Sequence, residues 1–221
     1  MSQLKYILDI EGTVCPISFV KDTLYPFFLK QVESLVKTND PTLQNLLAQF
    51  PVPQDASSLH EHIESLVNND IKDSVLKQLQ GYIWEQGYKS GEIKAPVYPD
   101  AIDFIQRHAP NVYIYSSGSV KAQILLFQHV EGDIDLTKSI AGYFDINTSG
   151  KKTEPQSYTN ILKSIGVPPS SASDVVFISD NDKELDAALD VGISTILALR
   201  PGNNPVSNAE KYKALNNFSS I

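Results

Sequence analysis

Near the start of the chain stands the stretch Tyr6-Ile7-Leu8-Asp9-Ile10-Glu11-Gly12-Thr13. Its first three residues form a short apolar run that ends abruptly at an acid, and a glycine follows shortly after. Such a run is typical of a buried parallel strand that carries functional residues at its carboxyl end. The stretch therefore predicts a parallel sheet with acidic side chains at its ligand-binding edge.

Three similar apolar runs occur much later in the chain and end at polar residues: Val112–Tyr115, Val175–Ile178 and Thr195–Leu199. Segments with helical periodicity lie around and between them: Asp100–His108, Val120–Gln128, Pro155–Ile165 and Lys183–Asp190. Strands that alternate with helices indicate βαβ units. We therefore predict the α/β class, with a Rossmann-like parallel sheet covered on both faces.

The long segment after the first strand, residues 16–92, has the pattern of helices only. Apolar residues recur at helical spacing from Leu24 to Val36, and Pro26 marks a start or a kink. Further on, Ser58-Leu59-His60-Glu61 fits a capping box. We predict a core domain of residues 1–15 and 93–221, with an all-helical cap domain of residues 16–92 inserted into it.

The place of this insertion suggests its role. Active sites of open α/β sheets lie at the strand ends from which such a segment emerges, which favours a lid over the site. The alternative is a peripheral helical bundle that never touches the substrate.

Bulk composition limits the classes of partner and compartment. The net charge is −8, and no cluster of Lys or Arg forms the basic stripe that a nucleic acid needs. Cys15 is the single cysteine, so no internal disulfide is possible, and neither a signal peptide nor a membrane span is visible. We expect no nucleic-acid or membrane partner and a cytoplasmic location, with the nucleus as an alternative. No heptad seam suggests assembly, so we expect a monomer.

Asp9 and Glu11 form the first of four polar groups at predicted strand ends. With two acids spaced this way, one carboxylate can face a ligand, and Gly12 lets the chain turn away without a Cβ clash. A carboxylate there can be a metal ligand, a nucleophile or both. Acids followed by glycine are also common in plain turns.

The second group is Ser116-Ser117-Gly118-Ser119. Its hydroxyls and backbone N–H groups could cradle a phosphate, could cap the following helix, or could do both. The third group is Lys151-Lys152, in which one lysine could neutralise phosphate charge and hold Asp9 ionised. Two adjacent lysines in a loop are otherwise solvated surface.

The fourth group is Asp180-Asn181-Asp182-Lys183-Glu184. Carboxylate oxygens at a strand end suit Mg²⁺, which keeps several waters and takes few protein ligands. Acids at the start of a helix are also favourable because they complement its dipole.

The order of these groups along the chain (acid pair, cap, serine, lysine, acid cluster) resembles the haloacid-dehalogenase-like phosphohydrolases. The resemblance implies that Asp9 is a nucleophile that forms an aspartyl-phosphate and that Glu11 is the general acid and base. It implies phosphate binding by Ser116, with Ser117 beside it, and by Lys152. Lys152 matches better than Lys151 because Tyr158 follows it by six residues. It also implies a magnesium cofactor held by Asp9, the Glu11 position and Asp180.

One departure from the usual pattern narrows the resemblance, because most members carry Asp where this chain has Glu11. Together with Ile114–Val120 and Arg200-Pro201-Gly202-Asn203, it resembles the enolase-phosphatases of methionine salvage over essentially the whole chain. The implied substrate is 2,3-diketo-5-methylthiopentyl 1-phosphate. It would be enolised and then dephosphorylated to the acireductone 1,2-dihydroxy-3-keto-5-methylthiopentene.

Three questions stay open at this stage. The base for enolisation is either Glu11 or a polar residue of the cap. The pocket for the methylthio tail could include Phe28, Tyr82 and Trp84, whose alternative role is ordinary core packing. The competing functions are a phosphatase for another small phosphoester and a receiver-like phosphate sensor.

Overall fold

The computed structural model describes residues 4–221 except 70 and 72, and the chain divides into two compact units. One unit ends at Phe19 and resumes with Lys94–Ile221, and the other is Val20–Ile93. The predicted core domain (residues 1–15 and 93–221) and cap domain (residues 16–92) remain predictions, because this division records only which residues pack together.

Within the described residues the first unit has a six-stranded sheet. Its strands are β1 (Lys5–Leu8), β2 (Val112–Tyr115), β3 (Ile140–Phe144), β4 (Val175–Ser179), β5 (Ser194–Ala198) and β6 (Lys213–Leu215). Their order is β3-β2-β1-β4-β5-β6, and every pairing is parallel, which confirms the predicted Rossmann-like sheet. Because β1 lies between β2 and β4, where the strand order reverses, its carboxyl end stands at the switch point that binds ligands in such sheets.

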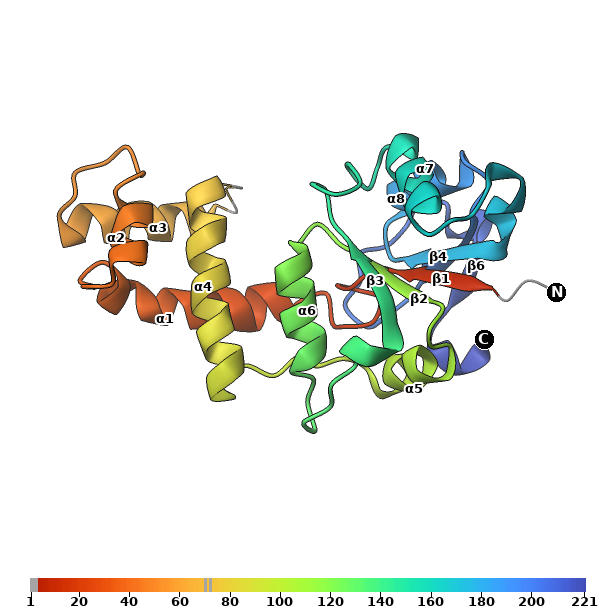
Figure 1. The fold of residues 1–221 in the computed structure, drawn as a ribbon, viewed down its shortest axis with the longest axis horizontal. Helices are drawn as coiled ribbons and strands as arrows, with labels where there is room; N and C mark the ends of the chain where they lie inside the picture. Colours follow the sequence, from red (N-terminus) through yellow and green to blue (C-terminus); the bar gives the residue numbers. More distant parts are fainter. Residues whose placement is uncertain (1–3, 70, 72) are drawn as a thin grey trace. The chain divides into compact units, whose positions relative to one another are not determined.

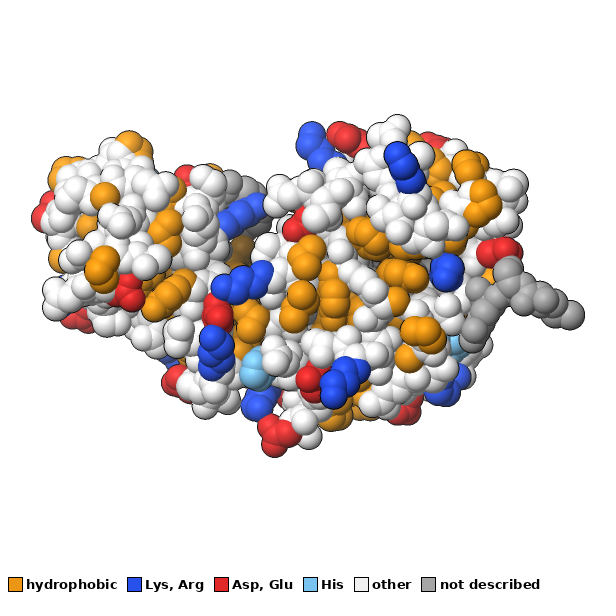
Figure 2. Space-filling model, viewed as in Figure 1, with side chains coloured by type: hydrophobic (Ala, Val, Ile, Leu, Met, Phe, Trp, Pro, Cys, Tyr) orange, Lys and Arg blue, Asp and Glu red, His pale blue; other side chains and the backbone are white. Residues whose placement is uncertain are grey.

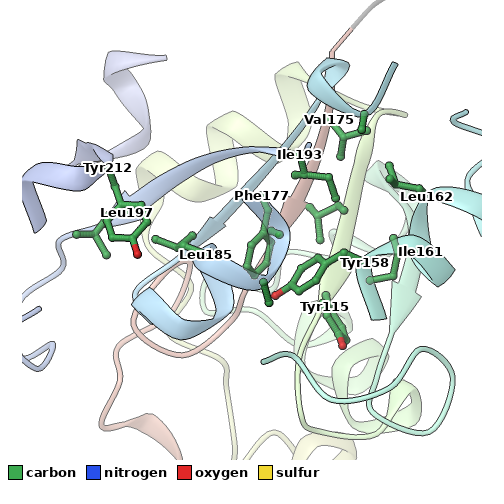
Figure 3. Close-up of a cluster of buried hydrophobic side chains, with 14 residues drawn as sticks. Tyr115, Tyr158, Ile161, Leu162, Val175, Phe177, Leu185, Ile193, Leu197 and Tyr212 are labelled. Carbon is green, nitrogen blue, oxygen red and sulfur yellow. The ribbon is translucent and has the colours of Figure 1, made fainter. Parts of the chain in front are cut away.

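Helices cover both faces of this sheet: α5 (Pro99–Arg107), α6 (Val120–Gln128), α7 (Pro155–Ser164) and α8 (Asp182–Leu189). Figure 1 shows α7 and α8 on one side and α5 on the other. On the first side, Tyr158 of α7 and Leu185 of α8 pack with Phe177 of β4 in a buried cluster (Figure 3). On the second, Tyr6 of β1 meets Phe104 of α5 edge-on, with ring centroids 4.9 Å apart.

The two edge strands, β3 and β6, were not predicted from the sequence. β3 contains Gly142 and is mostly only partly buried, and β6 is three residues long. An edge strand is covered less completely than a central one, so its hydrophobic pattern is weaker. Strands with few fully buried positions cannot be separated from loops by periodicity alone.

The second unit is helical throughout its described secondary structure. One π-helical turn (Val20–Leu24) leads into α1 (Tyr25–Leu35), and α2 (Pro41–Leu47), α3 (Ala56–Asn68) and α4 (Ser74–Ser90) follow. Its own hydrophobic core includes Phe28, Val32, Ile63 and Leu79, all fully buried. Pro26 sits in the first turn of α1, where proline is tolerated because its missing N–H has no partner to lose.

The capping box predicted at Ser58 is wrong. The N-cap of helix α3 lies three residues earlier, at Asp55, whose carboxylate accepts a hydrogen bond from the Ser58 backbone N–H at 3.0 Å. Asp55 has extended backbone angles, which is the conformation that an N-cap residue needs. The Ser58 hydroxyl donates to the same carboxylate at 2.7 Å and so belongs to the first turn rather than to the cap.

Two surface features bear on partners. On the face shown in Figure 2, Lys and Arg side chains are scattered among acidic and apolar ones and form no continuous stripe. No helix in the described part of the chain combines the length and the apolar character needed to cross a membrane.

Candidate active site

Asp9 lies directly after β1, and its side chain is buried, with three separate elements supplying its partners. Its Oδ1 accepts hydrogen bonds from the Ile10 backbone N–H at 2.8 Å and from Lys152 Nζ at 2.5 Å. The hydroxyl of Ser179, at the end of β4, lies 3.1 Å from Asp9 Oδ2. The carboxylate is therefore held at both oxygens, inside the edge that the parallel sheet creates.

Lys152 is the lysine that the fold brings to this carboxylate. Its Nζ also lies 2.7 Å from Glu184 Oε2, whereas Lys151 is exposed, 3.6 Å from Glu154. Burial disfavours the charge on Lys152, but the carboxylates of Asp9 and Glu184 outweigh burial and raise its pKa. Lys152 is therefore a fixed cation beside Asp9.

Two tyrosines hold the loop that carries Lys152. Tyr158 of α7 is fully buried, and its hydroxyl donates to the Lys152 backbone carbonyl at 2.8 Å. Tyr115, the last residue of β2, donates to the Gly150 carbonyl at 2.6 Å. The loop between β3 and α7 is thus held at the Gly150 and Lys152 carbonyls, which restricts the position of Lys152 Nζ.

Ser179 joins the site without having been predicted, and Glu184 joins it from the acidic group Asp180–Glu184, in which the sequence assigned it no role of its own. The Ser179 hydroxyl lies within hydrogen-bond distance of both Asp9 and Glu184, at 3.1 and 2.9 Å, yet it has one proton to give. Ser179 therefore donates to one of the two carboxylates at a time. Burial and the Asp9 charge raise the pKa of Glu184 to about 7.

Glu11 stands two residues beyond Asp9 and titrates differently. Burial, and then the Asp9 charge, raise the pKa of its carboxyl, while a hydrogen bond with Ser116 opposes the rise. A raised pKa keeps a carboxyl protonated to higher pH, and a carboxyl that has given its proton can take one back. The acid pair therefore has one member suited to attack and one suited to proton transfer.

Of the two roles considered for the serine loop after β2, the structure shows the helix cap. Ser116 is buried, and its Oγ accepts from the Gly118 backbone N–H at 3.3 Å, whereas Ser117 is exposed. Ser119 is the N-cap of α6 and accepts from the Ala122 N–H at 3.2 Å. Phosphate binding by Ser116 and Ser117 remains a prediction.

Gln123 and Asp145 support this loop and were also missed. Gln123 is 2% exposed, and its side-chain amide donates to the carbonyls of Gly118 and Phe144 at 2.8 and 2.9 Å. Asp145, just after β3, accepts from the Val120 N–H at 3.0 Å. These contacts join the carboxyl ends of β2 and β3, and local periodicity gives no sign of them.

Asp180 follows β4 and lies against the turn at Gly12. Burial and the Asp9 charge raise the pKa of Asp180 to about 6. Gly12 has φ +72°, and a Cβ added there would collide with Asp180 Oδ2. Glycine is thus required both for the turn and for the close approach of the carboxylate.

The site has more negative than positive groups, and its donors suit a metal ion. Four carboxyl groups interact with one another around the single cation of Lys152: Asp9, Glu11, Asp180 and Glu184. Their hard oxygens are what Mg²⁺ prefers. In the part of the chain that the structure describes, no three His, Cys, Asp or Glu side chains form a ready metal cage. The predicted ligand set of Asp9, the Glu11 position and Asp180 remains a prediction.

A second loop braces the turn after Asp9. After β5, Asn203 donates through Nδ2 to the Gly12 carbonyl at 2.8 Å, and Arg200 donates through Nε to the Thr13 carbonyl at 2.9 Å. Arg200 is buried, and its NH2 pairs with Asp100 at 2.7 Å. The Arg200–Asn203 stretch could be singled out only by its resemblance to a known family, because no local sequence pattern indicates contacts across nearly the whole chain.

The three residues considered for a methylthio pocket take part in packing inside the helical unit. Phe28 is fully buried in that unit's core. Trp84 donates its indole N–H to the Leu24 carbonyl at 2.9 Å, and the Tyr82 hydroxyl lies 3.3 Å from Asp40. Phe28 therefore fits the alternative role of ordinary core packing.

An oriented carboxylate, a fixed cation and a protonatable carboxyl together can support nucleophilic attack on a phosphate ester and hydrolysis of the resulting acyl phosphate. The Ser116 loop adds hydroxyl groups where a phosphate would be held. The arrangement thus supports phosphoryl transfer to Asp9.

Comparisons with known proteins agree with this chemistry. The profile of a hydrolase family described as haloacid dehalogenase-like matches residues 6–192. Enolase-phosphatase E1 of Zygosaccharomyces rouxii is 56% identical over 100% of both chains, and that of Saccharomyces cerevisiae is 58% identical over 98% of this chain and 97% of the relative. The crystal structure of the UTR4 protein of Saccharomyces cerevisiae, 55% identical, matches with a TM-score of 0.90 over 100% of both chains.

Proposed function

The chain belongs to the haloacid dehalogenase-like hydrolases and, within them, to the enolase-phosphatases, and we propose that it acts in methionine salvage on 2,3-diketo-5-methylthiopentyl 1-phosphate. It enolises this diketone and removes its phosphate, giving 1,2-dihydroxy-3-keto-5-methylthiopentene. The observation that carries the phosphatase half is the buried Asp9–Lys152 pair at the end of the central strand. The full-length likeness to enolase-phosphatases supports the choice of substrate.

Asp9 is the nucleophile in this proposal. Its carboxylate attacks phosphorus, the bond from phosphorus to the ester oxygen breaks, and an aspartyl-phosphate forms on Asp9. Lys152 and Ser179 fix the two carboxylate oxygens, so the attack starts from one orientation. Lys152, together with Ser116 and Ser117, binds the phosphate oxygens and offsets their charge.

Glu11 moves the protons. It gives its proton to the leaving oxygen, then takes one from the water that attacks the aspartyl-phosphate, and the Asp9 carboxylate is regenerated. Burial raises the pKa of Glu11, which supports the proton-donor role in the first step. The base that removes the carbon-bound proton during enolisation is Glu11 or a polar side chain of the helical unit.

Magnesium completes the proposed site. Asp9, the Glu11 position and Asp180 would hold it, and when bound it would neutralise charge on the phosphate oxygens and on the enediolate. The excess of carboxylates over cations at this edge supports the assignment.

The helical unit Val20–Ile93 serves as the lid in this proposal, because it is inserted directly after the strand that carries Asp9. The protein works as a monomer in the cytoplasm, with the nucleus as an alternative compartment. A buried, unpaired Cys15 supports a reducing compartment.

The test is release of inorganic phosphate from the diketone phosphate beside a panel of sugar phosphates, with and without magnesium. The proposal predicts magnesium-dependent turnover of many substrate equivalents and a preference for the diketone. Equal or better activity on sugar phosphates would overturn the substrate and leave the phosphatase assignment intact. Binding without turnover would instead favour a phosphate sensor.

A further inference from the structure

Asn203 follows β5 and occupies an unusual position beside the proposed metal site. Its Nδ2 donates to two backbone carbonyls, that of Gly12 at 2.8 Å and that of Ala198 at 3.1 Å. Both partners are acceptors, so the NH₂ group has to face them. The orientation of the amide is thereby fixed, and Oδ1 faces the other way.

Asn203 Oδ1 is buried and has no hydrogen-bond partner among the described residues. A buried acceptor without a donor is rare in folded proteins, and each case calls for a missing partner such as a water or an ion. The neighbourhood identifies that partner. A Cβ placed on Gly12 would come within 2.9 Å of Asn203 Oδ1 and would collide with Asp180 Oδ2, so both oxygens lie close to the same point beside Gly12.

We propose that Asn203 is a positioning residue of the magnesium site, which fixes the Gly12 peptide and accepts, through Oδ1, a hydrogen bond from a water bound to the metal. The inference rests on the proposed function, since it requires magnesium beside Asp180. An amide oxygen suits this task because a water on a cation is a strong donor. Such outer contacts orient a metal's ligands, and their loss typically lowers metal affinity about 10- to 100-fold.

The experiment measures magnesium binding without substrate. Magnesium chloride is titrated into the purified protein, and the dissociation constant is obtained from the rise in melting temperature. Asn203→Ala is expected to raise the magnesium Kd about tenfold. In a parallel assay its kcat returns to within about threefold of wild type at saturating magnesium, because the lost contact acts through metal affinity.

Two controls separate this role from general support of the loop. Asn204→Ala changes the exposed neighbour and should leave the Kd within about twofold of wild type. Arg200→Lys weakens the adjacent brace on the Thr13 carbonyl but keeps the Arg200 backbone carbonyl, which accepts from the Asn203 N–H at 3.2 Å, and it should leave the Kd within about threefold. If Asn203→Ala does not fold, Asn203→Ser is measured in its place with the same expectation.

A folded Asn203 variant that binds magnesium like the wild type would overturn the inference. So would an equal loss of affinity in Arg200→Lys, because loop loosening would then explain both. A wild-type protein that shows no response to magnesium would overturn the metal assignment itself, which is a failure of the proposed function and is distinguishable from the other two.

Discussion

Glu11 carries one methylene more than the aspartate usual at its position, which moves its carboxyl outward by roughly 1.5 Å. This reach suits a substrate that must lose a proton from carbon as well as its phosphate. The same residue holds a carboxyl whose pKa burial raises, so it can both give and take a proton. The length of the Glu11 side chain therefore affects removal of the proton from carbon, and its acidity affects proton transfer during phosphate release.

Two Glu11 variants separate these properties. Glu11→Gln cannot transfer a proton, so phosphate release from the diketone and from p-nitrophenyl phosphate should both fall about 10²- to 10⁴-fold. Glu11→Asp keeps the acid but shortens it, and should lose more activity on the diketone than on p-nitrophenyl phosphate, which needs no enolisation. Near wild-type rates for Glu11→Gln on both substrates would show that Glu11 is not the acid and base.

Asp180 makes stability depend on pH. Folding raises its pKa from its ordinary 3.8 to about 6, through burial and then the Asp9 charge, so the native state binds an extra proton between these values. Stability therefore falls as pH rises through this window, and an asparagine, which mimics the protonated acid, escapes the loss.

We compare the free energy of unfolding of Asp180→Asn with that of the wild type. The difference between them should grow by about 1–2 kcal/mol in favour of the variant as the pH rises from about 4 to about 8, after allowing for solvent screening. Urea unfolding of the metal-free proteins at both ends of this range measures the difference. A difference that stays constant with pH would show that Asp180 has no raised pKa.

At the scale of elements, the serine loop depends on a side chain from the helix that follows it. Gln123 of α6 supports the carbonyls of Gly118 and Phe144, and Gln123→Leu leaves both without this donor. We expect the KM for substrate and the Ki for inorganic phosphate to rise about tenfold, since each lost buried hydrogen bond is worth on the order of 1 kcal/mol.

Gln128→Leu is the matched control, because this glutamine is exposed at the end of the same helix. It should leave both constants unchanged, and magnesium affinity should stay the same in both variants. A Gln123 variant with an unaltered KM and Ki would show that the loop holds its shape without this residue.

At the scale of the whole molecule, the two units have separate hydrophobic cores. Leu79 is fully buried in the helical unit, and Leu79→Ala leaves a cavity that typically costs 2–5 kcal/mol. Hydrogen exchange should then speed up across Val20–Ile93 and stay unchanged in the sheet. Equal acceleration in both units would show that they unfold as one cooperative body.

Much of the secondary structure could be predicted from local sequence patterns. The elements that were missed or misplaced have weak or ambiguous patterns. The central strands and α5 to α8 were predicted close to their observed bounds, because a fully buried strand and a one-sided helix leave a strong period in the sequence. The edge strands β3 and β6 were missed because each has only one buried residue. The cap of α3 was misplaced because Asp55 competed with Ser58 for the same role.

The predicted site residues lie at strand ends, where the topology of a parallel sheet gathers them. Their supporting contacts could not be predicted in the same way. Ser179 and Asp9 are 170 residues apart, and Asn203 and Gly12 are 191 apart. No periodicity reports a hydrogen bond over such a separation, so the contacts of Ser179 and Asn203 became visible only in the folded structure.

The measurement that tests the account most directly is a search for phosphate on Asp9 during turnover. The reaction with the diketone phosphate is quenched rapidly in acid, and the acyl phosphate is located by peptide mass spectrometry. We expect it on the peptide that contains Asp9 in wild-type protein. Asp9→Asn should carry none and lose activity by roughly a thousandfold or more. Full turnover by a folded Asp9→Asn protein would contradict the account.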